Sequence, residues 1–310
     1  MKQSRQPALL VLVIVAIVVI GWGGASLRPA KGDQPTAVAL VETPVTIPPT
    51  PTPTLAVQTP VPTATTAPTP EPTMPPTPSP TIPPTPEETP RPVAPPNPYD
   101  QSFIIERGES GRREIAITFD AGEGTGAVGE MLDFLKENNV KVSFGITGNW
   151  ARENPELLQR MVDEGHMLFS HSDTHLSWTG VSTGLDPIPD DVRISELDGA
   201  EQAVLDITGY EMKPFFRPPY GDYDLDGLKL LKQQGYEYTV WWTCDSFGWQ
   251  GATAEEVMER CGPDSDLGGP GGIILMHVTQ EEDYRALKML VDAYRADGYD
   301  FVTIEQLIQP

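Results

Sequence analysis

Histidine and aspartate residues far apart in the chain have the types and spacing of a hydrolytic metal centre. The chain has only four histidines in 310 residues. His171 and His175 are four residues apart, so one turn could present both imidazoles to one divalent metal ion. His277 follows an apolar run and is interpreted either as a core residue or as a proton donor to a leaving group. Asp120 could take a proton from an attacking water. His166 precedes a predicted strand, and we expect it to be structural.

Two further charged residues could tune this centre. Arg217, in the run Arg217-Pro-Pro-Tyr220, could pair with Asp120 through a bidentate contact that keeps the carboxylate ionised. The alternatives are a helix-capping role for Asp120 and a surface arginine in a proline-rich turn. Asp245 ends a predicted strand, and a carboxylate paired with His277 would raise the pKa of the imidazole and keep it protonated.

The elements that must position these residues alternate between strands and helices after residue 98. The apolar patterns predict strands at 114–119, 140–147, 166–170, 214–217, 236–244, 272–278 and 299–304. They predict helices near 128–135, from 155, at 195–208 and 228–234, from 253 with a capping box, and at 281–296.

Repeated strand–helix units predict a parallel sheet or barrel with helices outside. The candidate residues all fall at or just after the C-terminal end of a predicted strand, which is the edge where parallel α/β proteins build their sites. The sequence therefore predicts one shared site from Asp120, His171, Arg217, Asp245 and His277.

Five segments resemble, in the same order, the motifs of the polysaccharide deacetylases of the NodB-homology type, which form carbohydrate esterase family 4. These segments are 118–122, 171–175, 217–220, Asp245 with Trp249, and 275–277. The resemblance covers about residues 112–308 and implies an α/β fold, a distorted (β/α) barrel with an open groove for a glycan. It implies a hydrolase acting on carbon–nitrogen bonds of linear amides, which removes acetyl groups from N-acetylated sugars of an extracellular or cell-wall polysaccharide such as peptidoglycan or a chitin-like polymer.

The resemblance also implies roles for individual residues. Asp120 would be the catalytic base, oriented by Arg217, and His277 would be the general acid, tuned by Asp245. The implied ligands of a divalent metal, usually zinc, are His171 and His175. The implied substrate-binding residues are Tyr220, Trp249 and Leu275.

Ala121 departs from the family pattern. The family normally has a second aspartate at this position, which serves as the third metal ligand. Here the metal would be held by two histidines with waters or another oxygen, such as that of Glu123. We expect weakened metal affinity with the base and the acid retained. Two alternatives stay open, a non-catalytic glycan-binding pseudoenzyme and an O-acetyl polysaccharide esterase.

The N-terminal third of the chain predicts export. Residues 1–31 contain an uncharged apolar run long enough to span a bilayer, and they are interpreted as a signal anchor or a cleaved signal peptide. Residues 32–99 form a predicted disordered linker rich in Pro and Thr. The deacetylase domain would be 100–310. This layout predicts an extracytoplasmic protein, anchored to the membrane by the N-terminal helix or secreted if that helix is cleaved.

Charge and cysteine content narrow the partners further. Residues 1–99 carry equal numbers of basic and acidic side chains, so the whole net charge of −23 lies on 100–310. Such a charge excludes nucleic acid as an expected partner and leaves a neutral or cationic polysaccharide substrate. The two cysteines, Cys244 and Cys261, could form a disulfide outside the cytoplasm or remain buried thiols.

Overall fold

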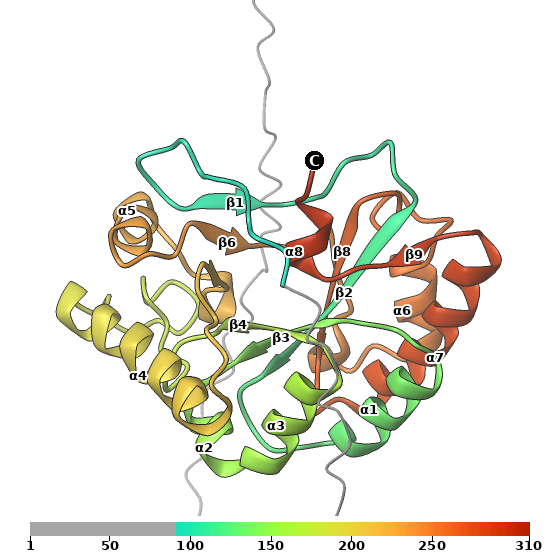
Figure 1. Ribbon diagram of the computed structural model, residues 1–310, viewed down its shortest axis with the longest axis horizontal. Helices are drawn as coiled ribbons and strands as arrows, with labels where there is room; N and C mark the ends of the chain where they lie inside the picture. Colours follow the sequence, from blue (N-terminus) through green and yellow to red (C-terminus); the bar gives the residue numbers. More distant parts are fainter. Residues whose placement is uncertain (1–90) are drawn as a thin grey trace, which may run out of the picture. The chain divides into compact units, whose positions relative to one another are not determined.

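A curled sheet of parallel strands forms the centre of the protein in the computed structural model, which describes residues 91–310 (Figure 1). The strand order is β1-β6-β5-β4-β3-β2-β8-β7, with β9 also paired to β2, and every pairing is parallel. The strands are β1 (Phe103–Ile105), β2 (Glu114–Ala121), β3 (Ser143–Ile146), β4 (Met167–Ser170), β5 (Phe215–Phe216), β6 (Tyr238–Val240), β7 (Cys244–Asp245), β8 (Gly272–His277) and β9 (Asp300–Phe301).

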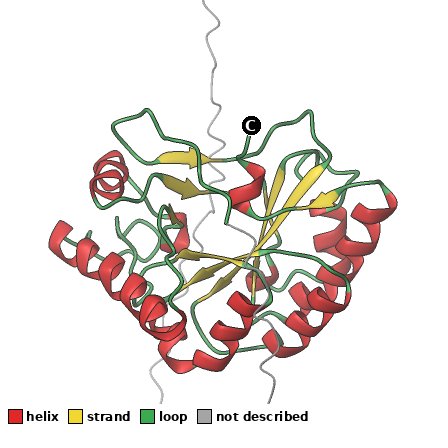
Figure 2. Ribbon diagram, viewed as in Figure 1, coloured by secondary structure: helices red, strands yellow, loops and turns green. Residues whose placement is uncertain are grey.

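Helices cover the outside of this sheet, as the predicted strand–helix alternation requires (Figure 2). The capping box predicted at Thr253 is present, with reciprocal bonds between Thr253 and Glu256. The helices are α1 (Val128–Glu137), α2 (Gly148–Glu153), α3 (Pro155–Asp163), α4 (Asp190–Thr208), α5 (Leu225–Gln233), α6 (Ala254–Cys261), α7 (Glu281–Ala296) and α8 (Ile304–Leu307), with short 3-10 turns η1 (Pro219–Gly221) and η2 (Gly248–Gln250).

The central strands are apolar on both faces because helices cover one face and the curled sheet encloses the other. On β2, Ile117 and Phe119 belong to the main core cluster, whereas Ala116 belongs to a second cluster. Successive side chains of a strand point to opposite faces. Thr118 and Asp120 therefore share the inner face with Ala116, and this alternation delivers the carboxylate to the inside of the curl.

The sheet is a curled half-barrel, which confirms the prediction of a parallel α/β fold. It differs from the predicted distorted barrel in that β1 and β7, at the two ends of the sheet, are not paired with each other. The predicted strand 236–244 is in fact two strands, β6 and β7, because residues 241–243 pass from one end of the sheet to the other. The Trp241 N–H donates to Ile105 on β1, whereas the Thr243 N–H donates to Ile273 on β8. The predicted strand 299–304 shortens to β9 and gives way to α8, which Thr303 caps.

The N-terminal predictions lie mostly outside the described residues. The anchor at 1–31 and linker residues 32–90 are not described. The last part of the predicted linker lies on the domain, where the Tyr238 hydroxyl donates to the Pro95 carbonyl and the Asn97 side chain donates to Glu237. Across residues 91–310, no helix combines the length and the apolar character that crossing a bilayer requires.

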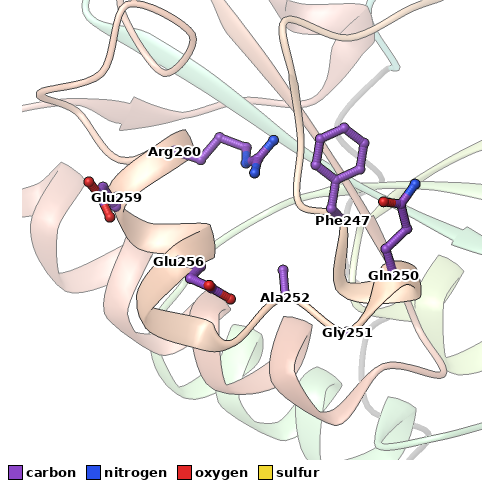
Figure 3. Close-up of a pocket in the computed structure, with 7 residues that line it drawn as sticks. All are labelled: Phe247, Gln250, Gly251, Ala252, Glu256, Glu259 and Arg260. Carbon is purple, nitrogen blue, oxygen red and sulfur yellow. The ribbon is translucent and has the colours of Figure 1, made fainter. Parts of the chain in front are cut away.

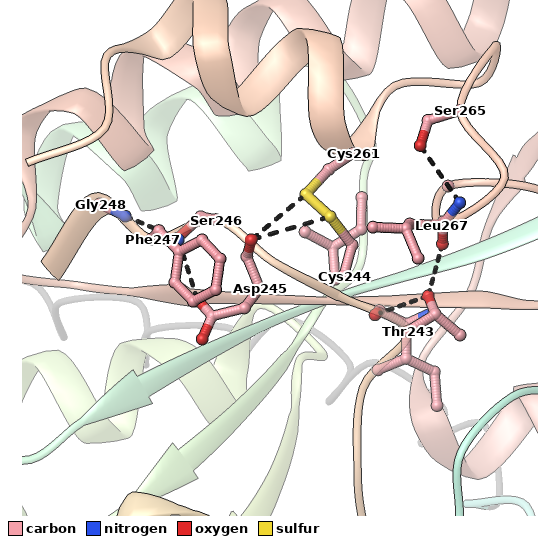
Figure 4. Close-up of a disulfide and its surroundings, with 12 residues drawn as sticks. Thr243, Cys244, Asp245, Ser246, Phe247, Gly248, Cys261, Ser265 and Leu267 are labelled. Atoms are coloured by element: carbon pink, nitrogen blue, oxygen red, sulfur yellow. Dashed lines mark hydrogen bonds between the residues drawn. A yellow bond between two sulfur atoms is a disulfide. The ribbon is translucent and has the colours of Figure 1, made fainter. Parts of the chain in front are cut away.

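Cys244 and Cys261 form a disulfide, which decides between the two states that the sequence left open (Figure 4). The bond joins β7 to the last residue of α6, and both cysteines are buried. It therefore ties the segment that carries Asp245 and Trp249 to the helix behind it.

Removing this disulfide should destabilise the domain. A loop closed over 17 residues restricts the unfolded chain enough to contribute about 3 kcal/mol. We expect the free energy of unfolding of a Cys244→Ala, Cys261→Ala variant to fall by about that amount in denaturant titrations. Reductant should lower the stability of the wild type and leave the variant unchanged. Equal stability of the two proteins under oxidising conditions would contradict this expectation.

Candidate active site

All nine residues predicted from the sequence line one pocket of about 570 Å³ at the C-terminal ends of the strands. The strand register explains the meeting of the first pair, since Asp120 on β2 lies directly beside His277 on β8. Thr118 and Leu275 are paired in the same way two residues earlier, on the same face of the sheet. Register partners of neighbouring strands carry side chains on the same face. A candidate base and a candidate acid therefore face one cavity, as the sequence predicted.

A buried ion pair fixes Asp120. Arg217, whose side chain is 1% exposed, donates from Nη1 to Asp120 Oδ1 at 2.7 Å. The predicted bidentate contact is absent, because Nη2 instead donates to the Thr118 hydroxyl at 3.0 Å and Nε donates to the Val240 carbonyl at 3.1 Å. Burial would raise the pKa of Asp120, but the charge of Arg217 and its hydrogen bond to the carboxylate hold that pKa below its ordinary value.

Gly145 makes room for the Asp120 carboxylate. It lies beside Asp120 in the β2–β3 register. A Cβ on Gly145 would come within 2.6 Å of Asp120 Oδ1 and of the Phe169 ring. Only glycine therefore fits at this point of β3 while the carboxylate keeps its place.

The two predicted metal ligands lie side by side with free imidazole nitrogens. The rings of His171 and His175 are 4.9 Å apart, and His171 Nδ1 bonds the Arg217 carbonyl at 2.8 Å. This bond requires a proton on Nδ1, so Nε2 of His171 keeps its lone pair, as in metal-bound histidines. Nε2 lies 3.4 Å from Asp120 Oδ2. Burial lowers the pKa of both imidazoles, that of His175 to about 3, so both are neutral.

This donor set fits a divalent metal held by two protein ligands. Ala121 is fully buried in the main core cluster and offers no ligand atom. Glu123 lines the pocket. In the described part of the chain, however, no three His, Cys, Asp or Glu side chains form a group that could hold a metal ion. The remaining coordination positions would go to water and substrate.

Strained backbone gathers around the pocket. Five non-glycine residues of the described chain have positive φ, and two of them, His175 and Tyr220, line the pocket. Two more, Ser172 and Phe247, are close in sequence to residues that line it. Such conformations cost about 1–3 kcal/mol each and persist where the surroundings enforce them, often at functional sites. The rings of the two strained residues His175 and Tyr220 meet edge to face at 4.7 Å.

Asp245 is placed differently from the prediction. Its Oδ1 accepts from the Phe247 backbone N–H at 2.9 Å, and its Oδ2 accepts from the Trp249 indole at 3.4 Å. It makes no hydrogen bond to His277, although both line the pocket. The pairing of Asp245 with His277 expected from the sequence is therefore absent, because a turn just after β7 commits this carboxylate to its own backbone.

The predicted substrate contacts differ in exposure. Tyr220 and Trp249 are each 53% exposed at the rim, whereas Leu275 is buried in the pocket wall. Exposed aromatic rings beside a cavity offer flat apolar surface to a sugar. His166 lies outside the pocket, buried against the Phe144 ring, as expected for a structural histidine.

The sequence assigned no role to three residues that line this pocket. Trp242 and Thr279 line it, and Ser182 reaches it from the segment before α4, where its hydroxyl donates to Asp222 at 2.6 Å. The residues around Ser182 have no periodicity that would have indicated this position.

A second hollow of about 650 Å³ lies between the η2 turn and α6 (Figure 3). Its residues include Phe247 and Arg260, whose guanidinium lies 4.3 Å over the Phe247 ring. None of the nine predicted residues lines it. Its charged side chains come from the exposed side of α6, so it lacks the buried acid–base arrangement of the first pocket.

An ionised carboxylate opposite an imidazole, beside two neutral histidines, is the arrangement of a hydrolase with a base, an acid and a metal position. Residues 107–239 match the family model described as polysaccharide deacetylase. The chain is 30% identical over 210 residues to the peptidoglycan-N-acetylmuramic acid deacetylase PdaA of Bacillus subtilis, spanning 68% of this chain and 76% of PdaA. It is 29% identical over 206 residues to a peptidoglycan-N-acetylglucosamine deacetylase of Bacillus cereus, spanning 65% and 70%.

A solved structure of a peptidoglycan N-acetylglucosamine deacetylase, in complex with 4-naphthalen-1-yl-N-oxidanyl-benzamide, has a TM-score of 0.59 to this one. The two chains are 26% identical, and the match covers 67% of this chain and 94% of that one. The chain belongs to the polysaccharide deacetylase family, which confirms the resemblance seen in the sequence.

Proposed function

We propose that this protein removes acetyl groups from N-acetylated sugars of a cell-wall polysaccharide, with peptidoglycan as the first candidate. The observation that carries the proposal is the register pair of Asp120 and His277 in one pocket, with Arg217 holding Asp120 ionised. Two relatives named for peptidoglycan deacetylation support the choice of glycan. Because their names specify different sugars, acetylmuramic acid and acetylglucosamine remain equal candidates.

The residues of the pocket divide the reaction between them. Asp120 accepts the proton of the attacking water, and Arg217 keeps that carboxylate ionised until it does so. The backbone N–H beside Tyr220 stabilises the oxyanion that forms on the acetyl carbonyl. His277 donates a proton to the departing sugar amine, so that acetate and a free amine leave. Leu275 and Trp249 enclose the acetyl methyl group, and Tyr220 contacts the sugar.

His171 and His175 would hold the divalent metal, with zinc as the first candidate. Such a metal supplies Lewis-acid polarisation of the acetyl carbonyl. The hydrogen bond from His171 Nδ1 to the Arg217 carbonyl orients one ligand and links it to the arginine that orients the base.

Metal binding should depend on these two histidines. We expect His171→Ala and His175→Ala variants to lose the zinc that the purified wild-type chain retains after dialysis, and His166→Ala to retain it. Chelator should lower acetate release by the wild type, and added zinc should restore it, because two protein ligands hold the metal less tightly than three. Elemental analysis gives the zinc content directly. Equal zinc in all three variants would contradict the assignment.

A non-catalytic glycan-binding role is the second candidate, and Ala121 favours it, since the residue contributes no third ligand. An O-acetyl esterase would use the same pocket residues. The matched variants His277→Gln and His166→Gln separate binding from catalysis. Catalysis requires that the first lose acetate release and the second keep it, whereas a binding module releases no acetate in either form.

We further propose that the domain works outside the cytoplasm, tethered by the N-terminal segment. The disulfide between Cys244 and Cys261 supports this location, because such bonds persist in oxidising compartments. Labelling of intact cells with a membrane-impermeant reagent would test it, since a cytoplasmic domain would stay unlabelled.

A further inference from the structure

Asp283 is a buried carboxylate beside His277 with no part in the reaction described above. It lies in the first turn of α7 and is 0% exposed. Its Oδ2 accepts the backbone N–H of His277 at 2.7 Å. The helix thus holds the end of β8 at the residue assigned as the general acid.

The turn after β7 is shaped around this carboxylate. A Cβ on Gly248 would come within 2.8 Å of the Asp283 Cγ, so no larger residue fits there while Asp283 keeps its place. The Gly248 N–H donates a hydrogen bond to the Ser246 hydroxyl at 3.2 Å (Figure 4). The segment from Ser246 to Gly248 therefore packs closely against the Asp283 carboxylate.

His277 and Asp283 each have a buried polar atom that makes no hydrogen bond. Nδ1 of His277 and Oδ1 of Asp283 are both buried, and neither makes a hydrogen bond of good geometry in the described chain, although the Ser246 hydroxyl lies close enough to Asp283 to lower its pKa. Buried polar atoms without partners are rare and costly. Asp245, the expected partner of His277, is committed to Phe247 and Trp249. Asp283 is thus a buried carboxylate that already accepts the His277 backbone N–H through Oδ2, and its Oδ1 is left to accept a hydrogen bond from the imidazole.

We propose that Asp283 is the positioning residue of His277, with Oδ2 fixing the strand end and Oδ1 accepting the Nδ1–H of the imidazole during the reaction. This arrangement leaves Nε2 of His277 to face the sugar amine. An ionised carboxylate beside the ring also stabilises its protonated form, which is the form that a general acid needs. The inference rests on the proposed function for the role of His277.

The charge state of Asp283 is compatible with this role. Burial raises the pKa of Asp283 to about 6, against lowering effects of the His277 N–H, the Ser246 hydroxyl and the His277 ring, while Asp245 raises it further. His277 and Asp245 are the titratable groups that act on it. At neutral pH the carboxylate is therefore ionised.

An Asp283→Asn variant tests the proposal, because the amide oxygen can still accept the His277 N–H while the charge is lost. We expect the alkaline limb of acetate release by the full chain to move to lower pH by about one unit, since the protonated imidazole loses its stabilising neighbour. The matched control is Glu305→Gln, which neutralises a buried carboxylate paired with Arg91, a residue that does not line the pocket. Its pH profile should equal that of the wild type.

The thermal stability of the Asp283→Asn variant separates a positioning role of Asp283 from a merely structural one. A raised pKa means that Asp283 favours folding below its unfolded pKa near 4 and loses that contribution as the pH rises through about 6. At pH 7.5 the uncharged Asp283→Asn variant should therefore melt no lower than the wild type, although its acetate release falls. A lower melting temperature with an unshifted pH profile would overturn the proposal.

NMR titration of the His277 imidazole tests its interaction with Asp283 without relying on enzymatic activity. With four histidines in the chain, the His277→Gln variant assigns the signal. We expect the imidazole pKa to fall by about one unit in Asp283→Asn and to stay unchanged in Glu305→Gln. An unchanged pKa in both variants would overturn the proposal. Absence of acetate release by the wild type would count against the proposed function alone, since the pKa shift remains measurable.

Discussion

Acetate release should fall by about 10²–10⁴-fold when Asp120 is replaced by Asn, the range that a lost general base covers. The amide has the shape of the carboxylate and can still accept the Arg217 Nη1–H, which Asp120 accepts at 2.7 Å. It cannot take a proton from water. The initial rate of acetate release by the full-length chain from N-acetylglucosamine oligomers measures the effect.

Glu305→Gln is also the control for this loss. Glu305 is a buried carboxylate held by an arginine, as Asp120 is, but it lies outside the pocket. Its variant should release acetate at close to the wild-type rate. An Asp120→Asn protein that keeps the wild-type rate would exclude Asp120 as the base.

Loss of Arg217 should have the largest effect on stability. In Arg217→Met the Asp120 carboxylate, 6% exposed, keeps its burial but loses its cation, and breaking such a buried pair costs about 3–5 kcal/mol. Denaturant titration at neutral pH measures the loss. In the wild type the lowered pKa of Asp120 means that the pair adds stability at neutral pH, which is lost as the pH falls through that pKa. In the variant, burial alone raises the pKa, so the deficit should shrink as the pH falls.

Two comparisons make this expectation specific. The double variant Asp120→Asn, Arg217→Met should lose less stability than Arg217→Met alone, because no buried charge remains unpaired. The Arg193→Met variant should also lose less stability than Arg217→Met. Arg193 is buried too, but its partners Asp190 and Asp224 are largely exposed and regain water. Equal losses in Arg217→Met and Arg193→Met, with no recovery in the double variant, would contradict the account.

The sequence predicted which residues meet in this pocket because the period of the strands and the positions of the strand ends determine it. Residues on one face of β2 and β8 alternate with core residues, so Asp120 and His277 had to reach the same edge once the strands were parallel neighbours. The histidine pair followed from its spacing. The segment 281–296 matched α7 from end to end, since its apolar spacing and acidic first turn are both local signals.

The parts that the sequence did not predict depend on contacts between distant segments. The break between β6 and β7 follows from pairing with β1 at one end of the sheet and β8 at the other, which no local pattern encodes. Asp245 ended a predicted strand, but its carboxylate bonds its own turn. Asp283 looked like one of three acidic residues opening a helix, and only the position of α7 against β8 buries it beside His277.

The most direct test of the central claim counts acetate and free amine together after the full-length chain acts on purified peptidoglycan. Hydrolysis of an N-acetyl group produces one amine for each acetate, whereas hydrolysis of an O-acetyl ester produces acetate alone. We predict equal amounts of the two products from the wild type and neither product from Asp120→Asn. Acetate without amine, or glycan binding without either product, would contradict the assignment of this pocket as an N-deacetylase.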